Sequence, residues 1–209
     1  MTPGVPALNP DLHGNVPDQS PVALVLIDVI NDFEYEAGPA LLERAMPIAE
    51  RLAALKRRCR EARIPAIYVN DNFGRWRSDQ RTLIEHCLKD GVRGEPFVRQ
   101  LLPDERDYFV LKPKHSGFYS TTLDTLLDYL AVHTVILTGL TGDYCVLFTA
   151  SDAFLRDFHI VVSSDCVASS DEDENEHALR HMQRVLDADV RPSTEIDLTR
   201  LSPGSPRRS

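Results

Sequence analysis

Apolar runs alternate with amphipathic stretches along most of the chain. Six runs have the apolar character of strands, the last of them short enough for a sheet edge: VALVLID (22–28), IPAIYVN (64–70), DYFVLK (107–112), HTVILTG (133–139), HIVVSS (159–164) and ADV (188–190). Residues at helical spacing predict helices between them: one that opens at Pro47, one that Ser78 caps and Gly91 ends, and three over 121–130, 145–157 and 172–187. The alternation predicts an α/β fold, a three-layer, doubly wound and mostly parallel six-stranded sheet.

The same pattern predicts a single domain over residues 22–192. A chain of 209 residues is long enough for one well-packed α/β domain and short for two. Residues 1–21 contain five prolines and little periodicity, so we expect an extended N-terminal arm. Residues 193–209 end in a polar, proline-containing stretch and are expected to form a C-terminal tail.

Composition and charge exclude several classes of protein. Apolar residues make up 43% of the chain and charged residues 26%, as in ordinary globular proteins. The net charge of −9 argues against nucleic acid or an anionic membrane as the main partner. No apolar run approaches the roughly 20 residues of a membrane span, and the N-terminal stretch lacks the features of a secretory signal. We therefore expect a cytoplasmic protein that acts on a small molecule.

The polar residues at the ends of the predicted strands suggest a catalytic site. Ligands of parallel sheets bind beyond the carboxyl ends of the strands. The first strand ends in Asp28, the second in Asn70 and Asp71, the third in Lys112, and the fourth leads through a turn to Cys145. A thiol becomes a nucleophile when a helix N-terminus and a cation favour its ionisation and a carboxylate takes its proton. With backbone N–H groups of the 140–145 turn to stabilise an oxyanion, this set suits acyl transfer to sulfur and hydrolysis of a thioester.

Each of these residues also has a purely structural interpretation. An aspartate at a strand end is commonly a turn or cap residue, a cysteine near a helix start is commonly a small core residue, and a lysine that closes a strand is commonly solvated. The four cysteines, Cys59, Cys87, Cys145 and Cys166, have neither CxxC nor zinc-site spacing and are expected to be free thiols. Spacing alone leaves the catalytic and structural interpretations open.

Three segments together resemble a known family. VLIDVINDF, VLKPKHSGFYSTTL and LTGLTGDYCVLFTASDAF are similar to the signature segments of the isochorismatase-like cysteine hydrolases, a family that includes nicotinamidases, N-carbamoylsarcosine amidase-like enzymes and isochorismatases. The resemblance covers roughly residues 20–192 and implies a Rossmann-like sheet and a catalytic triad of Asp28, Lys112 and Cys145, with Lys114 as the rival lysine. It also implies a cis peptide bond between Leu140 and Thr141, which would direct the N–H groups of Thr141 and Cys145 at an oxyanion.

The chain departs from the family pattern at two places. Nicotinamidases carry a metal site after the second strand, built from an aspartate and several histidines. The corresponding stretch here, VNDNFGRWRSDQ, has no histidine, and the next one is His86. We therefore expect no metal, no cofactor and a substrate other than nicotinamide. Ile30 stands where the family motif usually has glutamine. Because isochorismatases cleave a vinyl ether without needing a thiol, the presence of Cys145 favours C–N hydrolysis, with vinyl ether hydrolysis and a catalytically silent scaffold as alternatives.

Further residues are candidates for binding substrate. Phe33, Phe118 and Tyr144 lie within the motifs and are expected to wall the pocket, and Asn70 ends the second strand. Arg75 and Trp76 follow that strand, where they could bind and stack on a substrate carboxylate or form a solvated loop. The acidic run SSDEDENEH (169–177) is interpreted as a helix cap. The proline-rich arm and the family resemblance together predict a homo-oligomer, a dimer or a tetramer.

Overall fold

A computed structural model of the chain describes residues 19–73 and 79–201. Most of the predicted arm and tail, and Ser78, lie outside these residues. The strands are β1 (Val22–Ile27), β2 (Ala66–Asp71), β3 (Tyr108–Lys112), β4 (Thr134–Leu140), β5 (His159–Ala168) and β6 (Asp189–Arg191). The helices are α1 (Gly38–Glu61), α2 (Gln80–Lys89), α3 (Glu95–Gln100), α4 (Leu123–Tyr129), α5 (Leu147–Phe154) and α6 (Glu172–Val185), with the π-turn η2 (Gly142–Val146) and the 3₁₀ turn η3 (Ser193–Glu195).

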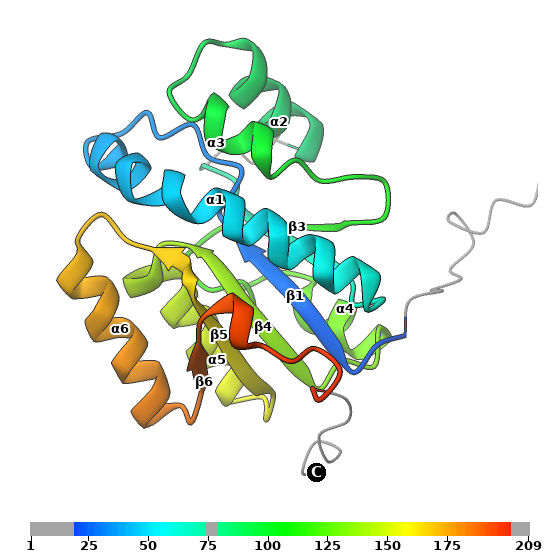
Figure 1. Ribbon diagram of the computed structural model, residues 1–209. Coiled ribbons are helices and arrows are strands. Elements are labelled where there is room, and N and C mark those ends of the chain that lie inside the picture. Colours follow the sequence, from blue (N-terminus) through cyan, green and yellow to red (C-terminus); the bar gives the residue numbers. More distant parts are fainter. Residues whose placement is uncertain (1–18, 74–78, 202–209) are drawn as a thin grey trace, which may run out of the picture.

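The six strands form one sheet in the order β3-β2-β1-β4-β5-β6, and every pairing within it is parallel (Figure 1). The predicted α/β fold is confirmed. The chain winds in one direction from β1 to β3 and in the other from β4 to β6. The winding reverses between β1 and β4, where Ile27 lies beside Gly139. Such a switch point opens a crevice at the carboxyl ends of the strands, which is where this type of sheet binds ligands.

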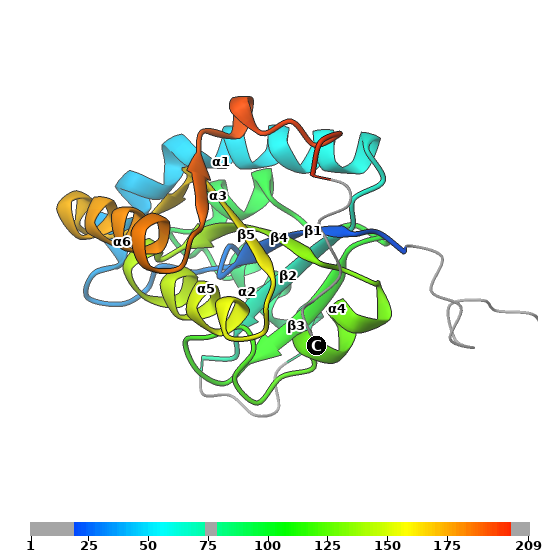
Figure 2. The same cartoon turned by 90° about the horizontal axis from the view of Figure 1, so that it is seen from below.

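Side chains of β1 alternate between the two faces of the sheet and belong to two separate hydrophobic cores. Val22, Leu24 and Leu26 pack in one core with α1, and Ala23, Val25 and Ile27 pack in the other with α4, α5 and α6. Figure 2 shows α1 on one side of the sheet and α4 and α5 on the other. All six residues are at most 1% exposed, which explains why this strand is a continuous apolar run rather than an alternating one. In the described residues no helix has the length and apolar character to cross a membrane.

Several predicted boundaries are wrong, each for a local reason. The first helix begins at Gly38, with Pro39 in its first turn, and Pro47 lies inside it rather than at its start. Asp79 caps α2, since its side chain accepts a hydrogen bond from the Thr82 N–H at 2.8 Å. β5 extends to Ala168, although polar residues interrupt its apolar run after Val162. The short helix α3, only six residues long, had no periodic signal from which to be predicted.

Gly139 allows β4 to lie close to β1 at the switch point. Its φ is +107°, and a Cβ there would lie 2.1 Å from the Ile27 carbonyl oxygen and 2.7 Å from the Ile27 nitrogen. Both atoms belong to the backbone of the central strand β1, so they cannot move without displacing that strand. Gly91, which follows α2, also has a positive φ, +70°, but a Cβ there would meet nothing within 4 Å.

These two glycines make a matched pair for a stability test. Gly91→Ala should lower the free energy of unfolding by about 1 kcal/mol, the cost of a left-handed backbone for a residue with a Cβ. Gly139→Ala should lower it by at least about 3 kcal/mol, because the new methyl group also displaces β1. Urea denaturation followed by circular dichroism measures both values. Equal losses for the two variants would show that the contact with Ile27 is unimportant.

Candidate active site

The side chains of Asp28, Lys112 and Cys145 meet at the carboxyl end of the sheet. The Lys112 Nζ lies 2.9 Å from Asp28 Oδ2 and 3.4 Å from Cys145 Sγ. Lys112 is 0% exposed and Asp28 7%, while Cys145 is half-buried. The sequence prediction that the three residues share one rim is therefore confirmed. The rival Lys114 is exposed, two residues beyond the end of β3.

Asp71, one of the polar residues at the predicted strand ends, joins this group, although the sequence analysis gave it no catalytic or binding role. It ends β2, the strand between those that lead to Asp28 and Lys112. Its backbone N–H donates a hydrogen bond of 2.6 Å to Asp28 Oδ1, and its own Oδ2 lies 3.6 Å from the Lys112 Nζ. Asp71 therefore orients the carboxylate of Asp28 and supplies the lysine with a second negative neighbour. Its position at a strand end was the only sequence signal for this role.

The backbone turns Asp28 sharply away from the strand that it follows. Its φ is +51°, a left-handed conformation that aspartate adopts more readily than most residues. Its N–H still donates to the Val69 carbonyl at 3.0 Å, so the turn begins only after the strand pairing is complete. The result is a carboxylate that points along the rim rather than into either hydrophobic core.

Cys145 lies in the π-turn η2, directly before α5. The Thr141 carbonyl accepts from the N–H groups of Tyr144 and Val146, at 3.2 and 3.0 Å, and so closes the turn. The Cys145 carbonyl accepts from Thr149 Oγ1 at 2.7 Å, and the same hydroxyl accepts from the Gly117 N–H at 2.9 Å. Thr149 thereby ties the cysteine to the loop that follows Lys112. The peptide bond between Leu140 and Thr141 is cis, as predicted.

Burial dominates the ionisation of these groups. It raises the pKa of the Cys145 thiol, the negative charge of Asp28 raises it further, and Lys112 only partly opposes them. Lys112 lowers the pKa of the thiol, as expected, but burial and the charge of Asp28 outweigh it. Burial also raises the pKa of Asp28, against the opposing effect of Lys112. Burial alone would lower the pKa of Lys112, but Asp28, Cys145 and Asp71 outweigh it and raise that pKa.

Burial outweighs the neighbouring charge at Asp28, whereas the neighbouring charges outweigh burial at Lys112. The difference follows from the neighbours of each group. Among the described residues, Lys112 has two carboxylates and a sulfur around its ammonium group, whereas Asp28 has one cationic neighbour, Lys112. The lysine is accordingly charged, and the thiol rests protonated beside a carboxylate whose affinity for protons is increased. This arrangement holds a nucleophile and its base in contact before any substrate arrives.

Three of the predicted substrate-binding residues have structural roles. Phe33 is 0% exposed and packs edge-on against Phe97 at 5.5 Å, so it belongs to the core. Phe118 is 5% exposed and packs against Phe158. The prediction that these two rings wall a pocket is wrong. The buried amide of Asn70 bonds the N–H and the carbonyl of Ile30, and so fixes the chain after β1. Arg75 and Trp76 lie outside the described residues.

Tyr144, by contrast, is half exposed next to Cys145. Its ring contacts His115 at 4.5 Å and Phe148 at 5.4 Å, and the three form an aromatic group at the rim. Tyr35 is also partly exposed, and burial followed by the charges of Asp28, Asp32 and Cys145 raises its pKa to about 12. His115, Phe148 and Tyr35 were not predicted. The spacing of Tyr144 and Phe148, one helical turn apart, was the available signal.

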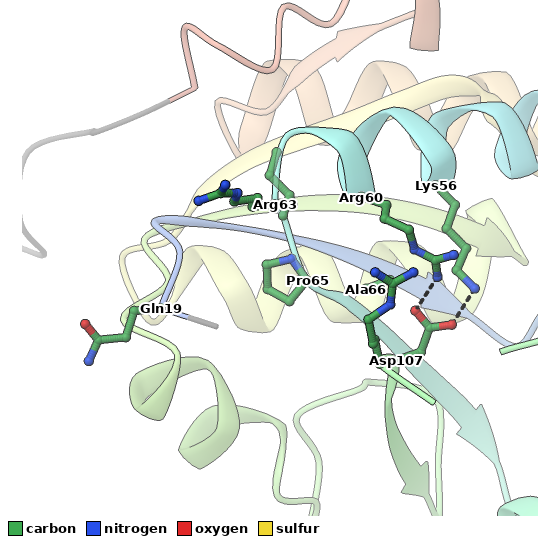
Figure 3. Close-up of a pocket in the computed structure, with 9 residues that line it drawn as sticks. Gln19, Lys56, Arg60, Arg63, Pro65, Ala66 and Asp107 are labelled. Carbon is green, nitrogen blue, oxygen red and sulfur yellow. Dashed lines mark hydrogen bonds and ion pairs between the residues drawn. The ribbon is translucent and has the colours of Figure 1, made fainter. Parts of the chain in front are cut away.

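A separate cavity lies at the opposite end of the sheet. It has a volume of about 310 Å³ and includes Ala66, the first residue of β2, and Asp107, which precedes β3 (Figure 3). Lys56 and Arg60 of α1 both form ion pairs with Asp107 there, and Arg60 also pairs with Asp104. Within residues 19–73 and 79–201, no group of three or more histidine, cysteine, aspartate or glutamate side chains is arranged to hold a metal ion.

Comparisons with known proteins agree with this geometry. Residues 22–191 match the family model described as the isochorismatase domain. An uncharacterised isochorismatase family protein of Bacillus subtilis is 39% identical over 174 residues, which are 83% of this chain and 95% of that protein. Nicotinamidase 3 of Arabidopsis thaliana is 27% identical over 175 residues, 79% of this chain and 82% of that protein. The crystal structure of N-carbamoylsarcosine amidase from Thermoplasma acidophilum superposes with a TM-score of 0.65 at 32% identity, over 85% of this chain and 99% of that one. The chain is a member of the isochorismatase family of hydrolases.

Proposed function

We propose that this protein is a metal-independent cysteine hydrolase that cleaves a C–N bond of a small amide or carbamoyl compound through a thioester. The observation that carries the proposal is the contact of one buried ammonium group, that of Lys112, with both the Asp28 carboxylate and the Cys145 sulfur. The similarity to a nicotinamidase and to N-carbamoylsarcosine amidase supports amide chemistry. The other three cysteines, Cys59, Cys87 and Cys166, are free thiols buried in the hydrophobic core.

The first half of the reaction forms the thioester. Asp28 takes the proton from the Cys145 thiol as Sγ attacks the substrate carbonyl carbon, and Lys112 stabilises the sulfur as it becomes negative. The N–H groups of Thr141 and Cys145 stabilise the oxyanion of the tetrahedral intermediate. As that intermediate collapses, the C–N bond breaks and Asp28 returns the proton to the leaving nitrogen, which departs as ammonia or an amine.

The second half regenerates the enzyme. Asp28, again ionised, takes a proton from water as the water oxygen attacks the thioester carbonyl. The C–S bond then breaks, the sulfur regains the proton from Asp28, and the product leaves as a carboxylic or carbamic acid. Because burial raises its pKa, the Asp28 carboxyl group can both accept and return a proton in each half. Lys112 keeps its proton throughout.

Two other functions use the same scaffold. A vinyl ether hydrolase of the isochorismatase type would need Asp28 as a proton donor but not the thiol, so the contact between Lys112 and Cys145 favours amide hydrolysis. A catalytically silent scaffold would have no chemical need for Asp28, Lys112 and Cys145 together. The predicted homo-oligomer and the cytoplasmic location stay predictions.

Cys145→Ala tests the nucleophile. The variant should keep the fold and lose at least ~10³-fold in turnover, because every covalent step passes through the sulfur. The assay screens small amides, ureides and isochorismate, with release of ammonia or of pyruvate as the two readouts. Cys166→Ala, which removes a buried core thiol, is the matched control. Near-normal turnover by Cys145→Ala, or release of pyruvate alone, would favour the vinyl ether reaction.

Asp28→Asn should separate thiol reactivity from turnover. Removing this charge takes away an influence that raises the pKa of Cys145, so alkylation by iodoacetamide should reach its half-maximal rate at a lower pH. Turnover should nevertheless collapse, because no base remains. Asp32→Asn alters a carboxylate that instead bonds His86, and should leave the alkylation profile unchanged. If Asp28→Asn turned over substrate within about threefold of the parent, Asp28 would not be the base.

Removal of metal ions should leave activity unchanged. The prediction rests on the histidine-free sequence after β2 and on side chains that perform the proposed steps themselves. Activity is measured after dialysis against a chelator and again after addition of zinc, iron or manganese. Activity that disappears on dialysis and returns only with one of these ions would contradict a metal-independent mechanism.

A further inference from the structure

A second set of polar side chains holds the turn that carries Cys145. Ser169 directly follows β5 and is 1% exposed. Its hydroxyl donates to Asp143 Oδ1 at 2.7 Å and accepts from the Asp143 N–H at 3.1 Å. Asp143 stands two residues before Cys145, within η2. One buried serine therefore binds both the backbone and the side chain of the turn.

Asn175 of α6 completes this set. Its side-chain oxygen Oδ1 lies 3.1 Å from Ser169 Oγ, so the serine hydroxyl proton is shared between this amide oxygen and Asp143 Oδ1. The same amide leaves no room beside Gly142, where a Cβ would lie 2.1 Å from the end of the Asn175 side chain and 2.7 Å from Val167. Glycine at position 142 allows the turn to rest directly on α6.

The position of α6 is itself fixed next to this contact. Asp171, its N-cap, accepts from the Glu174 N–H at 3.1 Å, and the Asn175 N–H donates to the Asp171 carbonyl at 3.2 Å. The capped first turn of α6 thus holds Asn175 in place, and Asn175 holds Ser169 and Gly142. The chain of contacts runs from the end of β5 and the start of α6 to the residues just before the nucleophile.

We propose that Ser169, Asp143 and Asn175 form a positioning clamp for Cys145. None of them touches the reacting atoms; they determine where the sulfur lies relative to Lys112 and Asp28. The proposal deepens the proposed function, since a displacement of about 1 Å at a nucleophile can cost 10²-fold in rate. Its effect on the thiol does not depend on that function, because the contact of Cys145 with its buried charged neighbours exists without substrate.

The test compares two serines of the same region. Ser163 lies within β5, is 0% exposed and donates to Asp165 Oδ1 at 3.1 Å, so Ser163→Ala removes a similar bond far from the turn. We expect Ser169→Ala to release the thiol from burial beside Asp28 and to shift the pH of half-maximal alkylation by iodoacetamide towards that of an ordinary thiol. Ser163→Ala should leave it unchanged. Mass spectrometry assigns the modification to each cysteine, and the buried Cys59 and Cys87 report any general unfolding.

A second pair of variants keeps the test decisive if Ser169→Ala unfolds. Asp143→Asn retains an oxygen that accepts from Ser169, whereas Asp143→Ala does not, and Asp143 is only half-buried. Asp143→Ala should shift the alkylation profile and Asp143→Asn should restore it. On a substrate that the parent hydrolyses, Ser169→Ala and Asp143→Ala should lower kcat about 10- to 100-fold and change KM less than about threefold.

The two proposals fail in different ways. If Ser169→Ala and Asp143→Ala both keep the parent alkylation profile, the clamp does not exist, whatever the activity. If the parent hydrolyses no amide but the two profiles shift while those of Ser163→Ala and Asp143→Asn do not, the clamp stands and the proposed function is wrong.

Discussion

The site depends on one buried cation. The Lys112 ammonium is excluded from solvent, and a buried charge is tolerated only when it is paired and hydrogen-bonded. Its partners come from three places: Asp28 after β1, Asp71 at the end of β2, and Cys145 in the turn after β4. Removal of Asp28 would leave the ammonium with the more distant carboxylate of Asp71, 3.6 Å away. The same cation therefore fixes the geometry of the site and makes a sulfur anion accessible during the reaction.

The fold brings these partners together through the reversal of winding between β1 and β4. Because the two strands are neighbours, the chain segments that leave their carboxyl ends start side by side, and Gly139 allows the close approach of their backbones. Lys112 reaches the site from the edge of the sheet, across β2, where Asp71 meets it. Ser169 and Asn175 hold the cysteine turn from the half of the sheet that contains β4 and β5. Lys112 comes from the other half. Each half of the doubly wound sheet thus contributes one side of the site.

Much of this could be predicted from the sequence, and the limits have physical causes. Buried parallel strands are continuous apolar runs, so their positions and order of alternation were predicted, and the family motifs identified Asp28, Lys112, Cys145 and the cis peptide bond at Leu140. Local patterns failed where distant contacts decide. Nothing near Phe33 in the sequence shows that Phe97 buries its ring. The helix boundary at Pro47 was wrong for a local reason, because Pro39 already lies in the first turn of that helix. The sequence indicated that Lys112 favours the Cys145 anion but not that burial outweighs the lysine, because burial is a property of the whole fold.

The central claim is that Cys145 rests as a thiol and gives its proton to Asp28 only as it attacks. The most direct test is the ultraviolet absorbance of the thiolate, recorded against pH for the parent and for Cys145→Ala, whose difference isolates this one sulfur. The account predicts no thiolate signal at neutral pH, a signal only in the alkaline range, and a shift of its appearance to lower pH in Asp28→Asn. A full thiolate signal from Cys145 at neutral pH would show that the sulfur is ionised before substrate binds, and would contradict the role assigned to Asp28.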